Sequence, residues 1–485
     1  MNDNSLRIKA FSGIVWSSVL RFGSMSITLA SNIILARLLI PSDFGCIGML
    51  MIFISLSNTF IDGGFGSALI QKKMPTLIDY TTIFYWNIFL SICLYLILFL
   101  CSPYISSFYK LPLLKDVLRV LGIVLIINAF SIVQQNILRK QLLFKKLSIV
   151  ILSSSFISLL ITIFAAYHGL GVWSLVIQQI SFSFFNAIFF WIVSKWSPLL
   201  FFSLKSFKEL FRFGGFVLLS NLFNTFSNEI QGLLVGRMFS PTTMGLYTQA
   251  YRLEGTASHA ISTILDQVTY PVLSSIQDDK KRLLSTLRRF TQIPAFFVAP
   301  LMAIMIVIAK PLIVFLFSEK WVACVPFFQI LCVAGLAVSL QGIANNAIAA
   351  IGYSDVSFKW TVVKRTLTII LCVAGICLYG MSGLLWACVL GSWSVFLIHA
   401  YLVSKYIGYN IYRQVLDICP YILLSLLCGL FVYYTGRSIK ACDIFLVSYQ
   451  IIIFYALYLF LIVVFRNETG LYIVNFLKSK LAGLC

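Results

Sequence analysis

The sequence contains few charged residues, and acidic residues are especially scarce. Asp, Glu, Lys and Arg make up 11% of the 485 residues and hydrophobic residues make up 60%, whereas a typical soluble protein has about 25% charged residues. So little polar surface cannot cover the exterior of a soluble fold, which excludes a soluble protein. The 36 basic residues outnumber the 16 acidic ones and give a net charge of +20. In a chain this apolar, the excess indicates cytoplasmic loops of a membrane protein and not nucleic-acid binding.

Residues and motifs that build metal centres and common catalytic sites are also scarce. The three histidines, His168, His259 and His399, are isolated, and the 12 cysteines are scattered singly, so no zinc site is expected. The sequence has no P-loop, no GxSxG and no HExxH motif, and no long loop carries paired carboxylates. We therefore expect no enzyme, no metal site and no cofactor. The one role for a small ion that we still consider is coupling of transport to H⁺ or Na⁺.

Long hydrophobic runs fill the chain and predict an all-α integral membrane protein. A membrane-spanning helix needs about 20 mostly apolar residues, and windows of that size give about fourteen candidates joined by short loops. The two near Leu222 and Ser258 are the most polar. The approximate centres of the fourteen are Ile27, Ile54, Leu90, Ile123, Leu159, Phe182, Leu222, Ser258, Pro300, Leu336, Ile370, Val395, Leu426 and Tyr455.

The positions of Lys and Arg predict the orientation of these spans. Basic residues concentrate at the N-terminus, in every second loop and in the C-terminal tail, which places both termini in the cytoplasm. Lys359, Lys364 and Arg365 are assigned to one of these cytoplasmic loops. Residues 203–213 and 472–484 are amphipathic, and each is expected to be either a helix in the membrane interface or a partly buried connector.

An internal repeat predicts two related lobes. Arg37, Pro41 and Gly45 recur as Arg237, Pro241 and Gly245, each 200 residues further along. Because six spans separate the copies, both halves enter the membrane in the same orientation, which makes a parallel repeat. We expect a six-helix N-lobe (1–200), a pseudo-symmetric six-helix C-lobe (201–408), and two additional helices with a cytoplasmic tail (409–485). Transporters of this kind bind substrate between the lobes and alternate access by rocking.

Charged residues within the spans are the candidate functional residues, because a charge in the bilayer usually faces a cavity or a partner. Arg21 and Arg252, one from each lobe, suit a phosphate or diphosphate, since a guanidinium binds phosphate oxygens bidentately. Four acidic residues are candidates for ion coupling or charge pairing: Asp62, Glu229, Glu254 and Asp266. The alternative is that Arg21 only pairs with Asp62, and Arg252 only with Glu254 or Glu229, to permit insertion.

Several motifs, in order along the chain, resemble one transporter family. They are residues 34–39 followed by Pro41, Asp43, Phe44 and Gly45, and then residues 62–72 (DGGFGSALIQK), 245–253 (GLYTQAYRL), 270–279 (YPVLSSIQDD) and 318–321 (SEKW). The chain resembles the polysaccharide flippases of the multidrug/oligosaccharidyl-lipid/polysaccharide exporter superfamily, in the branch of the colanic acid exporter. The resemblance implies a V-shaped, two-lobe transporter of fourteen helices. Arg21 best matches a diphosphate-binding arginine of relatives, whereas Glu254 beside Arg252-Leu253 departs from the pattern.

The resemblance also implies a substrate and a location. The substrate is an oligosaccharide repeat unit on undecaprenyl diphosphate, moved across the bacterial inner membrane for exopolysaccharide, capsule or O-antigen synthesis. Expected partners are this lipid-linked oligosaccharide, membrane lipids, and the polysaccharide polymerase and export machinery. Two other functions are open: an ion-coupled multidrug or toxin exporter on the same fold, whose cavity should be acidic, and a membrane-integral glycan polymerase, which needs a larger external loop.

Overall fold

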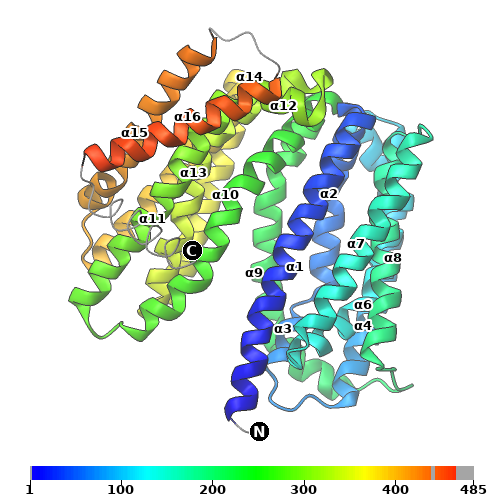
Figure 1. Cartoon of the computed structure of the whole chain (residues 1–485). Coiled ribbons are helices and arrows are strands. Elements are labelled where there is room, and N and C mark those ends of the chain that lie inside the picture. Colours follow the sequence, from blue (N-terminus) through cyan, green and yellow to red (C-terminus); the bar gives the residue numbers. More distant parts are fainter. Residues whose placement is uncertain (1–2, 438–442, 466–485) are drawn as a thin grey trace. The chain divides into compact units, whose positions relative to one another are not determined.

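The computed structural model describes residues 3–437 and 443–465, and the regular elements in these two ranges are all helices (Figure 1). In the first half of the chain they are α1 (Asp3–Leu38), α2 (Pro41–Asp62), α3 (Phe65–Gln71), α4 (Leu77–Tyr109), α5 (Leu113–Leu121), α6 (Ile123–Lys140), α7 (Phe144–Tyr167), α8 (Val172–Ser194) and α9 (Leu204–Met238). They continue with α10 (Pro241–Ser275), α11 (Lys280–Val307), α12 (Ala309–Phe317), the short 3₁₀ helix η1 (Glu319–Cys324), α13 (Val325–Ala350), α14 (Ser354–Ile407), α15 (Ile411–Arg437) and α16 (Asp443–Val464).

The described helices agree with fourteen spans. Eleven segments are long and apolar enough to cross a membrane. One of them, Lys359–Ile407, is two helices, because Tyr379 and Gly380 have non-helical backbone angles and divide α14. The helices α9 and α10 are not among the eleven, and they hold the two predicted spans that were the most polar. With α9 and α10 the count is fourteen. Each predicted centre lies in a described helix or in the junction between α5 and α6. The all-helical membrane fold is therefore confirmed.

Contacts divide the chain into two compact units, residues 1–248 and residues 249–485. In the first unit α1 packs on α7, α7 on α8, α8 on α6 and α6 on α4. Helix α9 belongs to this unit because it packs against α2, α3 and α4. The lobe boundaries at residues 200 and 408 are drawn from the repeat and not from packing, and they stay predictions.

A break after α2 allows α9 to approach it closely. Gly63 and Gly64 have positive φ angles of 56° and 69°, which only glycine adopts without strain, and they end α2 and start the short α3. A Cβ on Gly64 would lie 2.3 Å from the carbonyl oxygen of Gly214 in α9. The two backbones are therefore in direct contact where the chain turns, so the glycine pair serves both the bend and the close packing.

Residues 203–213 are the first turns of α9 and not a separate interfacial helix. Ser203 caps the helix by accepting a hydrogen bond from the backbone N–H of Ser206. The Phe207 ring lies 4.5 Å from the Trp86 ring and 5.7 Å from the Phe65 ring between centroids, and Leu210 is buried. Phe207 and Leu210 therefore pack on protein while Leu204 is exposed, so the segment is a partly buried connector. The second amphipathic segment, 472–484, lies outside the described residues.

A lysine on the loop before α4 ties α9 to that loop. Lys72 Nζ lies 3.0 Å from Oδ2 of Asp79 and 3.1 Å from Oε2 of Glu209 in α9. Partial burial lowers the pKa of Lys72, but its hydrogen bonds to the two carboxylates outweigh that effect and hold the pKa above its usual value.

A second lysine satisfies the C-terminal end of α3. Lys140 donates to the carbonyl oxygens of Leu69, Ile70 and Lys72.

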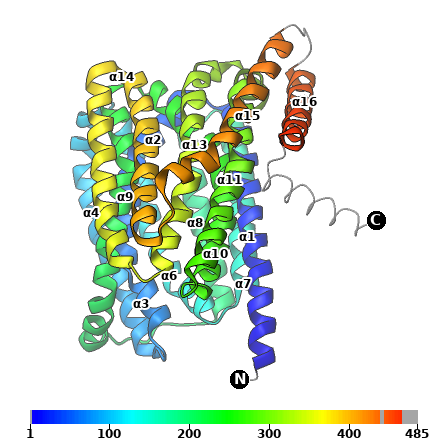
Figure 2. The same cartoon turned by 90° about the vertical axis from the view of Figure 1, so that its left-hand side faces the viewer.

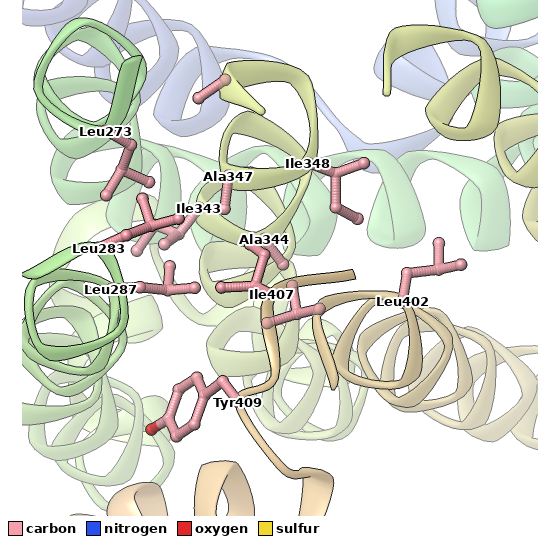
Figure 3. Close-up of a cluster of buried hydrophobic side chains, with 12 residues drawn as sticks. Leu273, Leu283, Leu287, Ile343, Ala344, Ala347, Ile348, Leu402, Ile407 and Tyr409 are labelled. Carbon is pink, nitrogen blue, oxygen red and sulfur yellow. The ribbon is translucent and has the colours of Figure 1, made fainter. Parts of the chain in front are cut away.

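In the second unit a cluster of buried side chains joins α10, α11, α13 and the second half of α14 (Figure 3). Leu273, Leu283, Leu287 and Ile343 contribute from the first three of these helices, and Leu402 from the last. The helices α15 and α16 pack on each other and on α11 (Figure 2).

A buried carboxylate fixes α15 to α11. Asp417, at 7% exposure, accepts two hydrogen bonds from the Arg288 guanidinium, at 2.6 and 2.7 Å. It accepts two more, from Gln292 Nε2 at 3.0 Å and from the Tyr409 hydroxyl at 2.5 Å. Burial and the adjacent carboxylate raise the pKa of Tyr409, so its hydroxyl remains a donor at neutral pH. The buried carboxylate, which accepts four hydrogen bonds, thus joins α15 to the exposed Arg288 of α11.

Candidate substrate and coupling site

The two copies of the repeat contact each other through their glycines, within the first unit. A Cβ on Gly45 would lie 1.8 Å from the carbonyl oxygen of Pro241, and a Cβ on Gly245 would lie 1.8 Å from the carbonyl oxygen of Pro41. Each glycine therefore contacts the proline at which the other copy's helix begins. The reciprocal geometry is what a local twofold axis produces, and it places this axis at the N-terminal ends of α2 and α10. The sequence repeat is thus a structural repeat.

The two candidate phosphate ligands lie on different units. Arg21 is in the middle of α1 in the first unit, and Arg252 is in the first half of α10 in the second. Both side chains are exposed, as a group that meets substrate must be. Their joint action on one diphosphate stays a prediction.

Asp62 lies at the break between α2 and α3, where local groups satisfy its carboxylate. It accepts a hydrogen bond from the backbone N–H of Gly64, and the cationic side chain that acts on it most strongly is Arg139. A Cβ on Gly66 would lie 3.1 Å from Oδ1 of Asp62 and 2.9 Å from the side-chain amide of Asn136. Asp62 is half-buried in this polar corner, which supports a charge-pairing role.

Glu229 lies on a polar stripe between α2 and α9. Ser55 Oγ donates to Glu229 Oε1 at 3.2 Å, and the hydroxyls of Thr59 and Thr225 are 3.1 Å apart. Polar contacts of this kind hold membrane helices together at roughly 0.6 kcal/mol each. Glu229 is half-buried, so the same carboxylate remains within reach of solvent.

Glu254 is the most deeply buried of the three acidic candidates whose side chains the structure describes, which are Asp62, Glu229 and Glu254. It is 7% exposed, and its Oε1 has no hydrogen-bond partner within the described part of the chain. A Cβ on Gly335 would lie 2.6 Å from this oxygen and 2.7 Å from the sulfur of Met302, so the carboxyl points into an apolar junction of α10, α11 and α13. An ionised carboxylate is costly in such surroundings, which favours a bound proton. Asp266 also lies on α10, but its side chain is outside the described residues.

The three basic residues assigned to one loop, Lys359 among them, belong instead to a helix of the second unit. Lys364 and Arg365 lie in the first half of α14, Lys364 is 5% exposed, and its Nζ is 2.6 Å from Nε2 of His399. The loop prediction was wrong because charge counting assigns every basic residue near the end of a span to the loop. The signal that could have found the pair is the apolar sequence that continues around it, TVVKRTLTII.

Metal ligands do not gather in the described ranges 3–437 and 443–465: no group of three or more His, Cys, Asp or Glu could hold an ion there. The candidate residues themselves offer recognition of anions by arginine and exchange of protons or small cations at carboxylates.

Comparison with protein families identifies the chain. Residues 34–326 match the model of the family described as "Polysaccharide biosynthesis protein". The chain belongs to this family.

The names of two relatives of this chain refer to cell-surface polymers. The teichuronic acid biosynthesis protein TuaB of Bacillus subtilis is 26% identical over 358 residues, which cover 73% of this chain and 74% of the relative. The lipopolysaccharide biosynthesis protein WzxC of Escherichia coli is 25% identical and covers 76% of each chain.

Solved structures with the same fold are membrane transporters. The lipid II flippase MurJ in an inward closed conformation aligns with a TM-score of 0.77 at 17% identity and covers 94% of this chain and 99% of that one. An inward-facing multidrug resistance transporter of the MATE family aligns with a TM-score of 0.59 at 16% identity, over 81% and 98% of the chains. This chain is therefore a multi-pass membrane protein with the fold of these transporters.

Proposed function

We propose that this protein is a flippase that moves undecaprenyl-diphosphate-linked oligosaccharide repeat units across the bacterial inner membrane by alternating access. Two observations together carry the proposal. The chain belongs to a polysaccharide biosynthesis family, and its described residues form membrane helices joined by short connections. Such a chain can contribute to polysaccharide synthesis by moving an intermediate across the bilayer. The relatives named for surface polymers and the flippase with the same fold support this function.

In this proposal Arg21 and Arg252 bind the diphosphate, and both termini are cytoplasmic. Their exposed guanidinium groups, on helices that otherwise carry mainly apolar and neutral residues, support the role. The distribution of basic residues supports the orientation. A polysaccharide polymerase and export proteins would receive the flipped product on the outer side.

The experiment that tests the function is deletion of the gene in its own host. We expect surface polysaccharide to be lost and the lipid-linked oligosaccharide to accumulate on the cytoplasmic side, because synthesis continues when translocation stops. Polysaccharide composition and extracted lipid-linked sugars would be measured, with the gene restored on a plasmid as the control. Loss of the lipid-linked sugar itself, in place of its accumulation, would indicate a role in synthesis and contradict the proposal.

We further propose that a proton carried by Glu254 couples transport to the membrane gradient. The unpartnered Oε1 supports a proton over Na⁺, because Na⁺ is a hard cation that prefers several oxygen ligands, whereas Oε1 lies beside Gly335 and the hydroxyl that hydrogen-bonds this carboxyl is that of Ser258. Glu254→Gln should keep the fold and remove the response of transport to an imposed pH gradient in vesicles, with Glu319→Gln, an exposed acid, as the control. Full gradient response in Glu254→Gln, or a response to a sodium gradient alone, would contradict this role.

A further inference from the structure

A basic pair in the first half of α14 is not used by any role given above. Lys364 and Arg365 are adjacent, and His399 comes from the second half of the same kinked helix, so the chain folds back to bring the imidazole to the lysine. Lys364 and His399 are 5% and 4% exposed, whereas Arg365 is half-buried and remains accessible. The arrangement therefore has a buried base and an accessible guanidinium next to it.

Hydrogen-bond chemistry fixes the role of the histidine. A lysine ammonium has three donors and no acceptor, so Nε2 of His399 must accept the 2.6 Å hydrogen bond and the imidazole is neutral, with its proton on Nδ1. His399 therefore orients Lys364 without contributing a charge of its own. The other ammonium protons of Lys364 stay available for a ligand.

Among the side chains that the structure describes, no carboxylate forms an ion pair with either of these cations. The charged group that acts on Lys364 is Arg365, and the ionisable group that acts favourably on Arg365 is the phenol of Tyr251. Neither cation takes part in the ion pairs found within residues 3–437 and 443–465, which are Lys72 with Asp79 and Glu209, and Arg288 with Asp417. Two adjacent cations in a low-dielectric interior repel each other, and an anion bound between them removes that cost.

We propose that Lys364 and Arg365, with Lys364 oriented by His399, form a binding site for a phosphate group in the second unit. Arg365 provides bidentate recognition of phosphate oxygens and Lys364 provides a buried point charge. Tyr251, which acts on Arg365, directly precedes the candidate diphosphate ligand Arg252 in the sequence of α10. That the phosphate is the diphosphate of the lipid-linked substrate rests on the function proposed above.

Binding by the purified full-length protein in detergent tests the site. The probes are undecaprenyl diphosphate, undecaprenol, which lacks phosphate, and inorganic pyrophosphate. We expect Arg365→Gln and Lys364→Gln each to weaken binding of undecaprenyl diphosphate about tenfold or more, since each removes a charge-assisted contact. Lys359→Gln is the matched control, because it removes the same charge from an exposed position of the same helix. Thermal unfolding shows which variants are folded. If the Lys364→Gln variant does not fold, the Arg365→Gln variant still tests the site, because Arg365 is only half-buried.

The outcomes separate this site from the proposed function. If the wild type binds undecaprenyl diphosphate and the folded Arg365→Gln variant binds it within twofold of the wild type, the site is wrong while the function stands. A second outcome is that the wild type binds pyrophosphate and the Arg365→Gln variant does not, while undecaprenyl diphosphate binds no better than pyrophosphate. In that case the phosphate site stands, and the assignment of the lipid-linked substrate is wrong. Equal binding of undecaprenol and undecaprenyl diphosphate would also overturn the site.

Discussion

Replacing Gly45 with alanine is expected to reduce polysaccharide export at least tenfold. The new Cβ would lie 1.8 Å from the carbonyl oxygen of Pro241, so the starts of α2 and α10 would have to separate by about 1 Å, which core packing does not absorb. Overpacking of this kind costs about 1–3 kcal/mol, and a tenfold change in rate corresponds to about 1.4 kcal/mol. Gly245→Ala should have the same effect because its Cβ meets the carbonyl oxygen of Pro41 in the same way. Surface polysaccharide per unit of protein in the membrane is the measurement.

A matched glycine and a double variant make this prediction specific. A Cβ on Gly215 of α9 would make only ordinary contacts, at 3.6 Å from the Phe211 ring, so Gly215→Ala should export normally. The variant with both Gly45→Ala and Gly245→Ala should lose less than the sum of the single losses, because the first substitution already separates the helices that the second would push apart. Normal export by the Gly45 variant would show that this contact does not matter to the transport cycle.

Removing Arg21 or Arg252 is expected to reduce export by about ten- to a hundredfold. Loss of a charge-assisted contact to a phosphate costs about 1.5–3 kcal/mol, and an alanine leaves the fold intact because both side chains are exposed. The lipid-linked oligosaccharide should accumulate in Arg21→Ala and Arg252→Ala cells that contain normal amounts of the protein. Lysine at either position should restore part of the export, since it keeps the charge but loses the bidentate geometry.

Two other arginines are the controls for charge removal. Arg212 of α9 and Arg413 of α15 are exposed and have no role in the proposed site, so Arg212→Ala and Arg413→Ala should export normally. If Arg21→Ala and Arg252→Ala both export at the level of these controls, the diphosphate assignment is wrong and the arginines serve insertion or packing.

Hydrophobic length was enough to predict the membrane-spanning helices of the fold. The fourteen centres could be located because a span needs about 20 apolar residues whatever it packs against. Even the weak spans at Leu222 and Ser258 proved to be long helices, α9 and α10. The 200-residue repeat predicted related halves, and the reciprocal contacts of Gly45 and Gly245 are its structural form.

The interior of the second unit could not be predicted from the same signals. The orientation rule counts Lys364 as a loop residue because it lies near the end of a span, and only tertiary packing shows that it meets His399, 35 residues later. The helix at 203–213 was ambiguous for a similar reason. An apolar face looks the same in sequence whether it meets lipid or, as at Phe207, another protein surface.

The central claim is that the protein translocates a lipid-linked oligosaccharide, and reconstituted transport tests it most directly. Purified protein would be placed in proteoliposomes that contain an undecaprenyl-diphosphate-linked oligosaccharide, and the sugar reaching the opposite leaflet would be measured with a glycan-modifying enzyme that cannot cross the membrane. We expect transfer that depends on the protein and falls about tenfold or more with Arg21→Ala. Transfer no faster than in protein-free vesicles, under an imposed proton or sodium gradient of either direction, would contradict it.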